Sequence, residues 1–483
     1  MNILQMKDLH TALKQLKKHY LVILIFVIFL VKVNLFINQP MIGQYDGMGD
    51  AQPRVMMVAA HNFIPTHGTW MPLLFNIIKT SLAIYDNPHL SPRFFSAVIN
   101  LYLVIILFIY FKHVTRDRLL SLIIIFLFLS SHFINSYFTF PLAEPIFSAS
   151  FFTAMYFLVK NKNFSTLLIS LLFFNICNAL RYEGWYLFPP MLFLAYRQAR
   201  PIKQLVFFSF MYFIYPIYWI WQNYLHTGDW MFFLNEKITF AHHSLDYMKK
   251  IGNVGYALNW LKKIYELLGM HQLLLIVCGL IVCFKQRRYR TLVFFFALSV
   301  YLIILLILQV YTGSMEWFPV QYLYLPYLFL IPFVAIIISS FIKSQKTKNG
   351  KLFSLLVIFF VITASGFYDN YKWLYVDMPN PESKIIQVLS LNTSTIGVFF
   401  PAGYVHTDLD WLMYFSYQYH YQGHELAREK YCDVLSAGEF DSILIFDTLD
   451  ETTKIINQCL MSYKIMYSDA RMLFLTTEPK IHK

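Results

Sequence analysis

Apolar runs long enough to cross a membrane alternate with short polar connections over the first three quarters of the chain. A helix needs about 20 residues, at about 1.5 Å rise each, to cover a hydrocarbon core of about 30 Å. The runs lie near residues 20–37, 93–111, 119–137, 142–159, 165–181, 184–197, 204–222, 269–285, 291–311, 320–342 and 351–367. This pattern predicts a polytopic α-helical membrane protein with about eleven transmembrane helices.

From about Tyr368 onward the pattern becomes that of a soluble domain. The runs TIGVFF and SILIFD are typical of buried strands, and KIMYSDARMLFLTT is typical of a hairpin that turns around Asp469. The segments WLMYFSYQY and ETTKIINQCLM have the apolar spacing of helices. We therefore expect a transmembrane domain over residues 1–367 and a small α/β domain over residues 368–483.

Two connections within the transmembrane domain are long. Residues 38–92 join the first two apolar runs, and residues 223–268 join the seventh and eighth. Both contain amphipathic stretches, such as ALNWLKKIYELL, with apolar residues at helical spacing and lysines between them. Helices of this kind are expected to lie along the membrane surface.

Lys and Arg gather in alternate short connections, which predicts the orientation in the membrane. The basic runs KHVTRDR, KNK, RQARPIK, KQRRYR and KSQKTKNGK fall on one side, whereas FTFPLA and TGSMEWFP on the other side contain neither residue. The N-terminus is therefore expected in the cytoplasm and the C-terminal domain outside it, as in a bacterial inner membrane protein. No small-residue cleavage site follows the first run, so we interpret it as a retained helix.

Composition agrees with this interpretation, since 58% of the residues are hydrophobic and only 14% are charged. The net charge of +12 is distributed among short loops rather than gathered on one folded face, so membrane lipids and not nucleic acids are the expected partners. Cys432 and Cys459 stand in the tail, and the sequence leaves open whether they pair. No cysteine spacing predicts a metal site.

The acidic residues are more informative than the basic ones. Of the twelve Asp and Glu residues before the tail, only Asp8 and Asp117 fall on the predicted cytoplasmic side. An ionisable group at the edge of a membrane segment is costly unless it has a partner or a function. Most of the ten outer acids are interpreted as solvated loop charges. The ten are Asp46, Asp50, Asp86, Glu144, Glu183, Asp229, Glu236, Asp246, Glu266 and Glu316.

The densest polar segment, YDGMGDAQPRVMMVAAHNF, follows the first apolar run. It contains Asp46, Asp50, Arg54 and His61 within sixteen residues. Asp50 and Arg54 are four residues apart and could pair on one face of a helix, which would orient the carboxylate as a general base. The alternative, which the spacing does not exclude, is that Asp46 or Asp50 caps an interfacial helix.

Further polar residues stand at the outer ends of later apolar runs. Arg93 and Glu144 each stand where an apolar run begins, and Arg181 and Glu183 lie together in NALRYEGW. These last two could neutralise each other or snorkel to the interface. Alternatively, Arg181 could bind a phosphate.

Six short patterns together resemble the bacterial and archaeal GT-C glycosyltransferases, the superfamily of the protein mannosyltransferases and the lipid A aminoarabinose transferase. They cover roughly the first half of the chain, in the same order and on the same predicted side. The matching segments are Asp50-Ala51-Gln52-Pro53-Arg54, Trp70 to Leu73, Pro92 to Ser96, Glu144-Pro145, Arg181 to Glu183, and Thr227 to Asp229.

The resemblance implies inverting transfer of a sugar from a polyprenyl-phosphate donor to an acceptor at the extracytoplasmic face. It implies Asp50 as the catalytic base, with Asp46 as the alternate. It also implies that basic residues hold the donor phosphate and that further polar residues bind substrate. The donor-phosphate candidates are Arg181, Arg54 and Arg93, and the substrate-binding candidates are Glu183, Glu144, His61, Trp70 and Asp229.

One departure from the family concerns a late helix. Many relatives carry an Arg before a Tyr-Leu-x-Pro run, and this chain has Gln321 in Val-Gln-Tyr-Leu-Tyr-Leu-Pro. If that Arg normally meets the donor phosphate, another residue must do so here. Relatives differ in metal dependence, and beyond Asp46 and Asp50 this sequence has no cluster of oxygen ligands, so we expect no metal and no cofactor.

Two other functions remain open at this point. A transporter or flippase of lipid-linked glycans explains the helices and the outer acids, but it predicts charged or broken helices near the membrane midplane, where Lys32 is the clear candidate. A non-catalytic assembly or scaffold protein would tolerate changes at Asp50. The sequence does not identify the sugar or the acceptor, which could be a glycan, a lipid or a protein.

Overall fold

The computed structural model describes most of the helical part of the chain and the strands of the tail. Side chains are described over much of residues 62–131, 142–236, 272–311 and 320–345. The complete set of described residues is 25–34, 54–55, 58–59, 62–87, 90–131, 142–236, 254–255, 258, 261–262, 265, 272–286, 289–311, 320–345, 347, 350, 354 and 357, with the backbone of 396–400, 422–425, 442–446, 463–468 and 472–477.

The chain divides into two compact units. The first combines residues 1–39, 65–77 and 90–371, and it holds the helices discussed below except the end of α3. The second combines residues 40–64, 78–89 and 372–483. The boundary predicted between residues 367 and 368 stays a prediction, because parts of the first long loop group with the tail.

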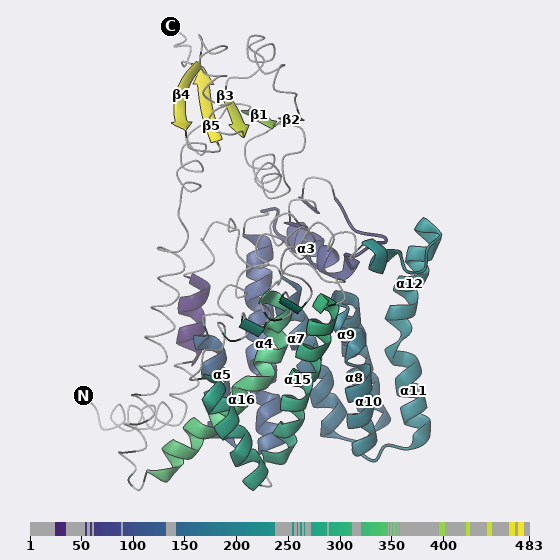
Figure 1. Cartoon of the computed structure of the whole chain (residues 1–483), viewed down its shortest axis with the longest axis vertical. Helices are drawn as coiled ribbons and strands as arrows, with labels where there is room; N and C mark the ends of the chain where they lie inside the picture. The colour runs from purple at the N-terminus through teal and green to yellow at the C-terminus, as the bar shows by residue number, and fades with distance from the viewer. Residues whose placement is uncertain are drawn as a thin grey trace, which may run out of the picture. The chain divides into compact units, whose positions relative to one another are not determined.

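Helices occupy the predicted apolar runs of the first unit (Figure 1). Proline and an acidic cap mark two of the starts: Pro92 stands in the first turn of α4, and the Asp117 carboxylate accepts a hydrogen bond from the Leu120 amide at the start of α5. The helices are α3 (Pro72–Ile84), α4 (Ser91–Thr115), α5 (Arg118–Ser130), α7 (Ala143–Lys160), α8 (Phe164–Leu180), α9 (Glu183–Tyr186), α10 (Phe188–Arg197), α11 (Ile202–Tyr212), α12 (Ile214–Thr227), α15 (Arg290–Tyr311) and α16 (Tyr324–Ser344), the last preceded by the short 3-10 helix η2 (Val320–Leu323).

Aromatic rings fill the core where α4, α7, α15 and α16 meet. The ring centroids of Phe111 and Phe295 are 5.7 Å apart, those of Phe295 and Phe329 are 5.3 Å apart, and Phe152 stacks on Phe295 at 6.2 Å. All four side chains are fully buried. Such contacts add to the packing that holds helices together in lipid, where burial from water is no driving force.

The seventh predicted run is two helices, α11 and α12, that meet at Phe213. Pro216 has no N–H to donate to the carbonyl of Tyr212, so the helical ladder is interrupted there. Two asparagines of α8 satisfy the interrupted backbone. Asn178 donates to the Tyr212 carbonyl at 2.8 Å, and Asn175 donates to the Met211 carbonyl at 2.9 Å.

Four described helices are long and apolar enough to cross a membrane: Ser91–Thr115, Ile202–Thr227, Thr291–Gln309 and Tyr324–Ser344. Others, such as Ile25–Asn34 and Gln272–Lys285, are apolar but shorter. The chain is thus an integral membrane protein, while the count of about eleven spans stays a prediction. The predicted run at 351–367 lies almost entirely outside the described residues.

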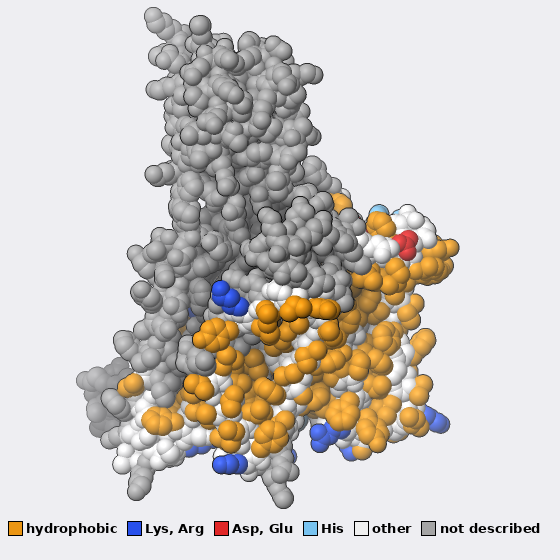
Figure 2. Space-filling view, viewed as in Figure 1, with side chains coloured by type: hydrophobic (Ala, Val, Ile, Leu, Met, Phe, Trp, Pro, Cys, Tyr) orange, Lys and Arg blue, Asp and Glu red, His pale blue; other side chains and the backbone are white. Residues whose placement is uncertain are grey.

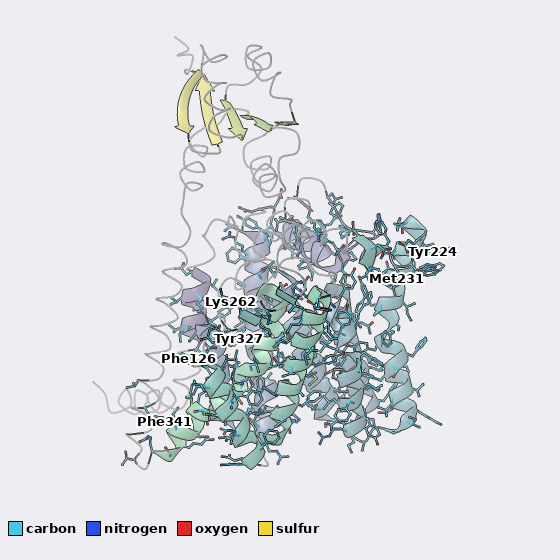
Figure 3. All side chains as sticks on the ribbon, viewed as in Figure 1. Phe126, Tyr224, Met231, Lys262, Tyr327 and Phe341 are labelled. Carbon is cyan, nitrogen blue, oxygen red and sulfur yellow. The ribbon has the colours of Figure 1, made fainter. Side chains whose placement is uncertain are left out.

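The exposed surface of the helical unit is mainly hydrophobic in Figure 2, with Lys and Arg side chains along the lower edge of that view and a further basic group higher up, beside the grey region. Tyr224 and Met231, labelled in Figure 3, lie at the opposite end, where α12 finishes. The Tyr224 ring stacks on Trp230 at 4.0 Å, as suits amphipathic rings at a membrane surface. Which end faces the cytoplasm stays a prediction.

The tail contains a five-stranded mixed sheet in the order β2-β1-β3-β5-β4. The strands are β1 (Ile396–Phe400), β2 (Gln422–Glu425), β3 (Ser442–Phe446), β4 (Tyr463–Ser468) and β5 (Met472–Thr477). The predicted strands β1 and β3 pair in parallel, and β4 and β5 form the predicted antiparallel hairpin. The sequence did not predict β2, and the two predicted tail helices, Cys432 and Cys459 lie outside the described residues.

Candidate functional site

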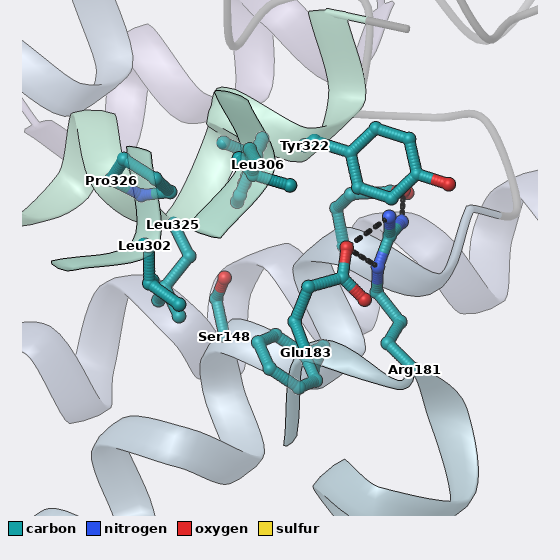
Figure 4. Close-up of a pocket in the computed structure, with 11 residues that line it drawn as sticks. Ser148, Arg181, Glu183, Leu302, Leu306, Tyr322, Leu325 and Pro326 are labelled. Carbon is teal, nitrogen blue, oxygen red and sulfur yellow. Dashed lines mark hydrogen bonds and ion pairs between the residues drawn. The ribbon is translucent and has the colours of Figure 1, made fainter. Parts of the chain in front are cut away.

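Three charged side chains meet at the end of the bundle where α7 begins and α8 ends. Arg181 forms ion pairs with Glu144 of α7 and with Glu183 of α9. Its Nη2 is 2.7 Å and its Nε is 3.1 Å from Oε1 of Glu183. The guanidinium also lies 4.7 Å from the centre of the Tyr322 ring, as Figure 4 illustrates. The cluster therefore joins three segments that are far apart in the sequence.

The local sequence explains how Arg181 is presented. Helix α8 stops at Leu180, and Arg181 is extended, with φ −152° and ψ 143°. The following turn packs tightly on the end of α8, since a Cβ on Gly184 would come within 2.7 Å of the Asn178 side-chain oxygen. Trp185 Nε1 donates to the Asn178 carbonyl at 3.0 Å. The turn RYEGW is thus fixed on α8, which holds Arg181 and Glu183 at one edge.

A hollow adjoins the charged cluster and encloses about 320 Å³ of space between atoms, including the part that opens outward. Ser148, Glu183 and Arg181 lie on one side of it and Leu302, Leu325 and Pro326 on the other (Figure 4). The complete lining is Glu144, Phe147, Ser148, Arg181, Glu183, Leu302, Leu306, Tyr322, Tyr324, Leu325 and Pro326.

Two polar atoms in this lining stand out. Within the described part of the chain, Oε2 of Glu144 and Oγ of Ser148 are buried and have no hydrogen-bond partner. Glu144 is 3% exposed and Ser148 is fully buried. Buried polar atoms are normally satisfied, so each such atom calls for an explanation such as a water or a ligand.

Among the described residues, the charges of the cluster sum to a negative value, because two carboxylates surround one guanidinium. The side chains of Glu144, Arg181 and Glu183 are 4%, 11% and 14% exposed, so water screens them poorly. Arg181 is therefore engaged by carboxylates in this state. An anion that approaches it must compete with at least one of them.

A second polar cluster fixes the loop that precedes α3. The Gly68 amide donates to Asn223 Oδ1 at 2.8 Å, and the Thr69 hydroxyl donates to Glu236 Oε2 at 2.9 Å. Gly68 has φ +93°, a backbone conformation that strains any residue with a Cβ, and a Cβ there would also meet Glu236 Oε2 at 2.5 Å, so glycine is favoured. The Tyr182 hydroxyl donates to the Gly68 carbonyl at 3.3 Å. Burial raises the pKa of Tyr182, which keeps it a hydrogen-bond donor.

The predicted site residues are only partly brought together. Glu144, Arg181 and Glu183 line one hollow. Asp229 is half-buried and caps the segment after α12, since its oxygens accept from the Met231 amide and the Asn235 side chain, both at 2.8 Å. This cap accounts for both oxygens, so a role of Asp229 in substrate binding stays a prediction. Trp70 is 36% exposed, with its ring 5.9 Å from Phe75.

The remaining predicted residues are buried or lie outside the described part. Arg93 is fully buried in the first turn of α4, and Arg54 is half-buried. Asp46, Asp50 and His61 lie outside the described residues, so the predicted base is untested. Within the described part no three His, Cys, Asp or Glu side chains gather as a metal site would require.

Sequence reasoning missed most of the lining of the hollow, including the polar residues Ser148 and Tyr322. Ser148 stands four residues after Glu144, which places both on one face of α7, and this spacing could have identified it. Tyr322 belongs to the run that was singled out because Gln321 replaces an Arg. Its contact with Arg181 joins segments 141 residues apart, which no local pattern can reveal.

Comparison with known proteins identifies a shared fold. The chain matches the crystal structure of apo ArnT, a GT-C aminoarabinose transferase, from Cupriavidus metallidurans, with a TM-score of 0.57 and 10% identity. It matches ArnT from the same organism bound to undecaprenyl phosphate with a TM-score of 0.54 and 9% identity. Each match covers 94% of this chain and 97% of the other. The chain has the ArnT fold.

No family model and no curated protein sequence matches the chain. At about a tenth identity, the likeness to ArnT concerns the fold and not the activity.

Proposed function

We propose that this chain is a glycosyltransferase that moves a sugar from a polyprenyl-phosphate donor to an acceptor hydroxyl at the extracytoplasmic face of the membrane. The observation that carries the proposal is the ArnT fold over 94% of the chain, together with undecaprenyl phosphate bound in one of those structures. A fold hosts its chemistry at particular residues, so the proposal also depends on the hollow at Arg181.

The hollow suits a lipid phosphate in two respects. Its walls are largely apolar, from Phe147, Leu302, Leu306 and Leu325, and one rim carries a guanidinium. Apolar walls suit the isoprenoid chain, and the planar fork of an arginine suits phosphate oxygens. Hydrophobic helices surround the site, so the donor can arrive from the bilayer.

Arg181 also compensates for the departure at Gln321. The guanidinium of Arg181 lies over the ring of Tyr322, the residue that follows Gln321 in the chain. We propose that Arg181 takes the place of the arginine found in relatives before the Tyr-Leu-x-Pro run. Arg54 and Arg93 remain proposed as further phosphate-binding residues.

Donor binding then requires an exchange of partners at Arg181. Glu183 holds Nε and Nη2 of Arg181 and is more exposed than Glu144, at 14% against 4% for the side chains. We propose that the phosphate displaces Glu183, which turns toward water, while Glu144 keeps its ion pair. The exchange keeps the charge of Glu144 neutralised. Glu144 is more buried than Glu183, so leaving it without a counter-ion would cost more free energy.

The proposed reaction needs a base on the face of the sugar opposite the departing lipid phosphate. Asp50, with Asp46 as the alternate, removes the proton of the acceptor hydroxyl as its oxygen attacks the anomeric carbon. The bond from that carbon to the phosphate oxygen breaks, and the lipid phosphate leaves with the electron pair. Attack from the opposite face inverts the configuration. His61, Trp70 and Asp229 remain proposed as substrate-binding residues, and no metal is required by this scheme.

The test is sugar transfer by purified protein supplied with polyprenyl-phosphate sugars. Asp50→Asn is expected to lower the rate about 10²–10⁴-fold, the usual contribution of a positioned base, and Asp46→Asn is expected to lower it less. Asp86→Asn is the matched control, because Asp86 is an exposed acid of the same long loop. It is expected to leave the rate unchanged.

Unchanged transfer in both Asp50→Asn and Asp46→Asn would reject the assigned base. Failure of the unmodified protein to transfer sugar from any such donor, while it moves labelled lipid across vesicles, would favour the transporter instead.

A further inference from the structure

The hollow beside Arg181 contains two buried polar atoms that neither the ion pairs nor the proposed phosphate contact uses. These are Oε2 of Glu144 and Oγ of Ser148, which have no hydrogen-bond partner within the described residues. Both side chains belong to α7 and line the same hollow. Because they are four residues apart, they are neighbours on one helix face, about 5–6 Å apart at Cβ.

Several buried hydroxyls of the bundle, unlike that of Ser148, donate to a carbonyl of their own helix. Serine and threonine hydroxyls in these helices commonly donate to the carbonyl four residues earlier, as Thr115 does to Phe111 and Thr153 does to Ala149, both at 2.7 Å. Ser148 has no such bond to the carbonyl of Glu144. Its hydroxyl points instead into the space that faces Leu302 and Leu325 in Figure 4.

The chemistry of the pair selects a class of ligand. Oε2 of Glu144 can only accept a hydrogen bond, and the Ser148 hydroxyl can both donate and accept. The charge of Glu144 is already matched by Arg181 through Oε1, so Oε2 needs a neutral donor rather than a second cation. A carboxylate on the ligand would face two glutamates at close range.

We propose that Glu144 and Ser148 form a hydroxyl-recognition subsite for a neutral sugar ring of the donor. This inference rests on the proposed function and deepens it. One ring hydroxyl donates to Oε2 of Glu144 and exchanges a hydrogen bond with Ser148, while the apolar wall packs against the ring. The negative excess of the cluster disfavours donors that carry a uronic acid.

The experiment measures affinity, so that it is independent of turnover. The probes are undecaprenyl phosphate, undecaprenyl-phosphate-linked neutral hexoses with their monodeoxy analogues, and the corresponding uronic acid donor, titrated into the purified full-length protein. In the unmodified protein, one monodeoxy analogue is expected to bind about threefold to tenfold more weakly than its parent, as one lost hydrogen bond predicts. The uronic acid donor is expected to bind more weakly than the parent.

Ser148→Ala is expected to reduce the difference between the parent and that analogue, because the bond to Glu144 remains, and to leave the affinity for bare undecaprenyl phosphate unchanged. Ser339→Ala is the matched control. Ser339 is also a buried serine whose hydroxyl has no hydrogen-bond partner within the described residues, but it does not line the hollow. It is expected to keep the full difference.

An equal penalty for every analogue in Ser148→Ala and in the unmodified protein would overturn the inference. So would a change in thermal stability alone, which would assign the two atoms to a structural water. If the unmodified protein binds these donors with the predicted discrimination but transfers no sugar, the proposed function fails and the subsite stands. If transfer depends on Asp50 while Ser148→Ala changes no affinity, the subsite fails and the proposed function stands.

Discussion

Two arginines with little exposure lie at opposite ends of α7, Arg200 buried and Arg181 nearly so, and their surroundings differ in kind. Among the described residues, the acceptors that Arg200 binds are neutral: Nη2 donates to the carbonyls of Leu158 and Asn161 at 3.1 and 2.8 Å, and Nη1 donates to Gln204 Oε1 at 3.2 Å. Arg181, at the other end, binds two carboxylates beside a hollow. One arginine closes a helix end, and the other is held in a charged cluster.

The difference distinguishes an arginine with a structural role, Arg200, from one that we assign to the site, Arg181. A cation at the C-terminal end of a helix satisfies carbonyls that have no partner in the helix, so Arg200 is explained by the fold alone. One carboxylate is enough to neutralise one guanidinium, but Arg181 has two. The fold alone does not explain the second carboxylate. Burial therefore does not distinguish the two arginines, but the charge and the space around them do.

The largest expected effect comes from the removal of each arginine. Arg181→Gln leaves two buried carboxylates without their counter-ion, which is expected to lower the free energy of unfolding by about 3–5 kcal/mol and to abolish binding of undecaprenyl phosphate. Arg200→Gln is expected to cost about 1.5–3 kcal/mol through its lost hydrogen bonds and to leave lipid affinity unchanged. Thermal unfolding and lipid titration of both variants measure this. Equal lipid affinity in Arg181→Gln and Arg200→Gln would contradict the different roles assigned to the two arginines.

A smaller effect of opposite sign is expected at Glu183. Glu183→Gln removes one of the two carboxylates that compete with phosphate for Arg181, so undecaprenyl phosphate should bind about tenfold more tightly, which corresponds to about 1.4 kcal/mol. Glu144→Gln is the comparison, because Glu144 is expected to keep its ion pair when lipid binds. Weaker binding in Glu183→Gln would show that Glu183 helps to hold the lipid rather than competing with it.

The smallest effect concerns Asp117, at the same end as Arg200. Burial acts to raise the pKa of Asp117, but hydrogen bonds from Lys343, the Leu120 amide and Tyr289, with the charge of Lys343, outweigh it and lower the pKa below its ordinary value of 3.8. A lowered pKa means that the carboxylate adds stability above about pH 4 and loses it as the pH falls through the folded-state value.

Asp117→Asn keeps a capping side chain but removes this charge. Its melting temperature is expected to lie below that of the unmodified protein by a constant amount near neutral pH, and the gap is expected to close below about pH 4. The gap is expected to be modest, since Lys343 is 38% exposed. A gap that widens as the pH falls would contradict the assignment, and lipid affinity near neutral pH should not change.

The sequence predicted much of this fold because membrane helices are specified locally. Apolar length located α4, α8, α15 and α16, and the strands β1 and β3 followed from short apolar runs. The break at Phe213 was missed, although Pro216 was visible, because a proline near one end of a long apolar run can be tolerated. Pro216 is tolerated because Asn175 and Asn178 of α8 bond to the freed carbonyls. These asparagines lie outside the apolar run, so the run alone does not reveal the break.

For the site, the sequence identified the charges but not their partners. Arg181 and Glu183 stand two residues apart, so their pairing could be anticipated. The pairing of Arg181 with Glu144, 37 residues earlier, depends on how α7 and α8 pack, and its contact with Tyr322 depends on the entry to α16. Contacts between residues so distant in the sequence cannot be predicted from local spacing.

The contacts of Gly68 and Thr69 with Asn223 and Glu236 have a consequence for exchanging parts between relatives. They tie the segment before α3 to the segment around the end of α12, 155 to 167 residues away. A chimera that imports the first long loop without the region that contains Asn223 and Glu236 leaves the carboxylate of Glu236 opposite a foreign residue. The two segments therefore depend on each other, and a chimera should take both from the same parent protein.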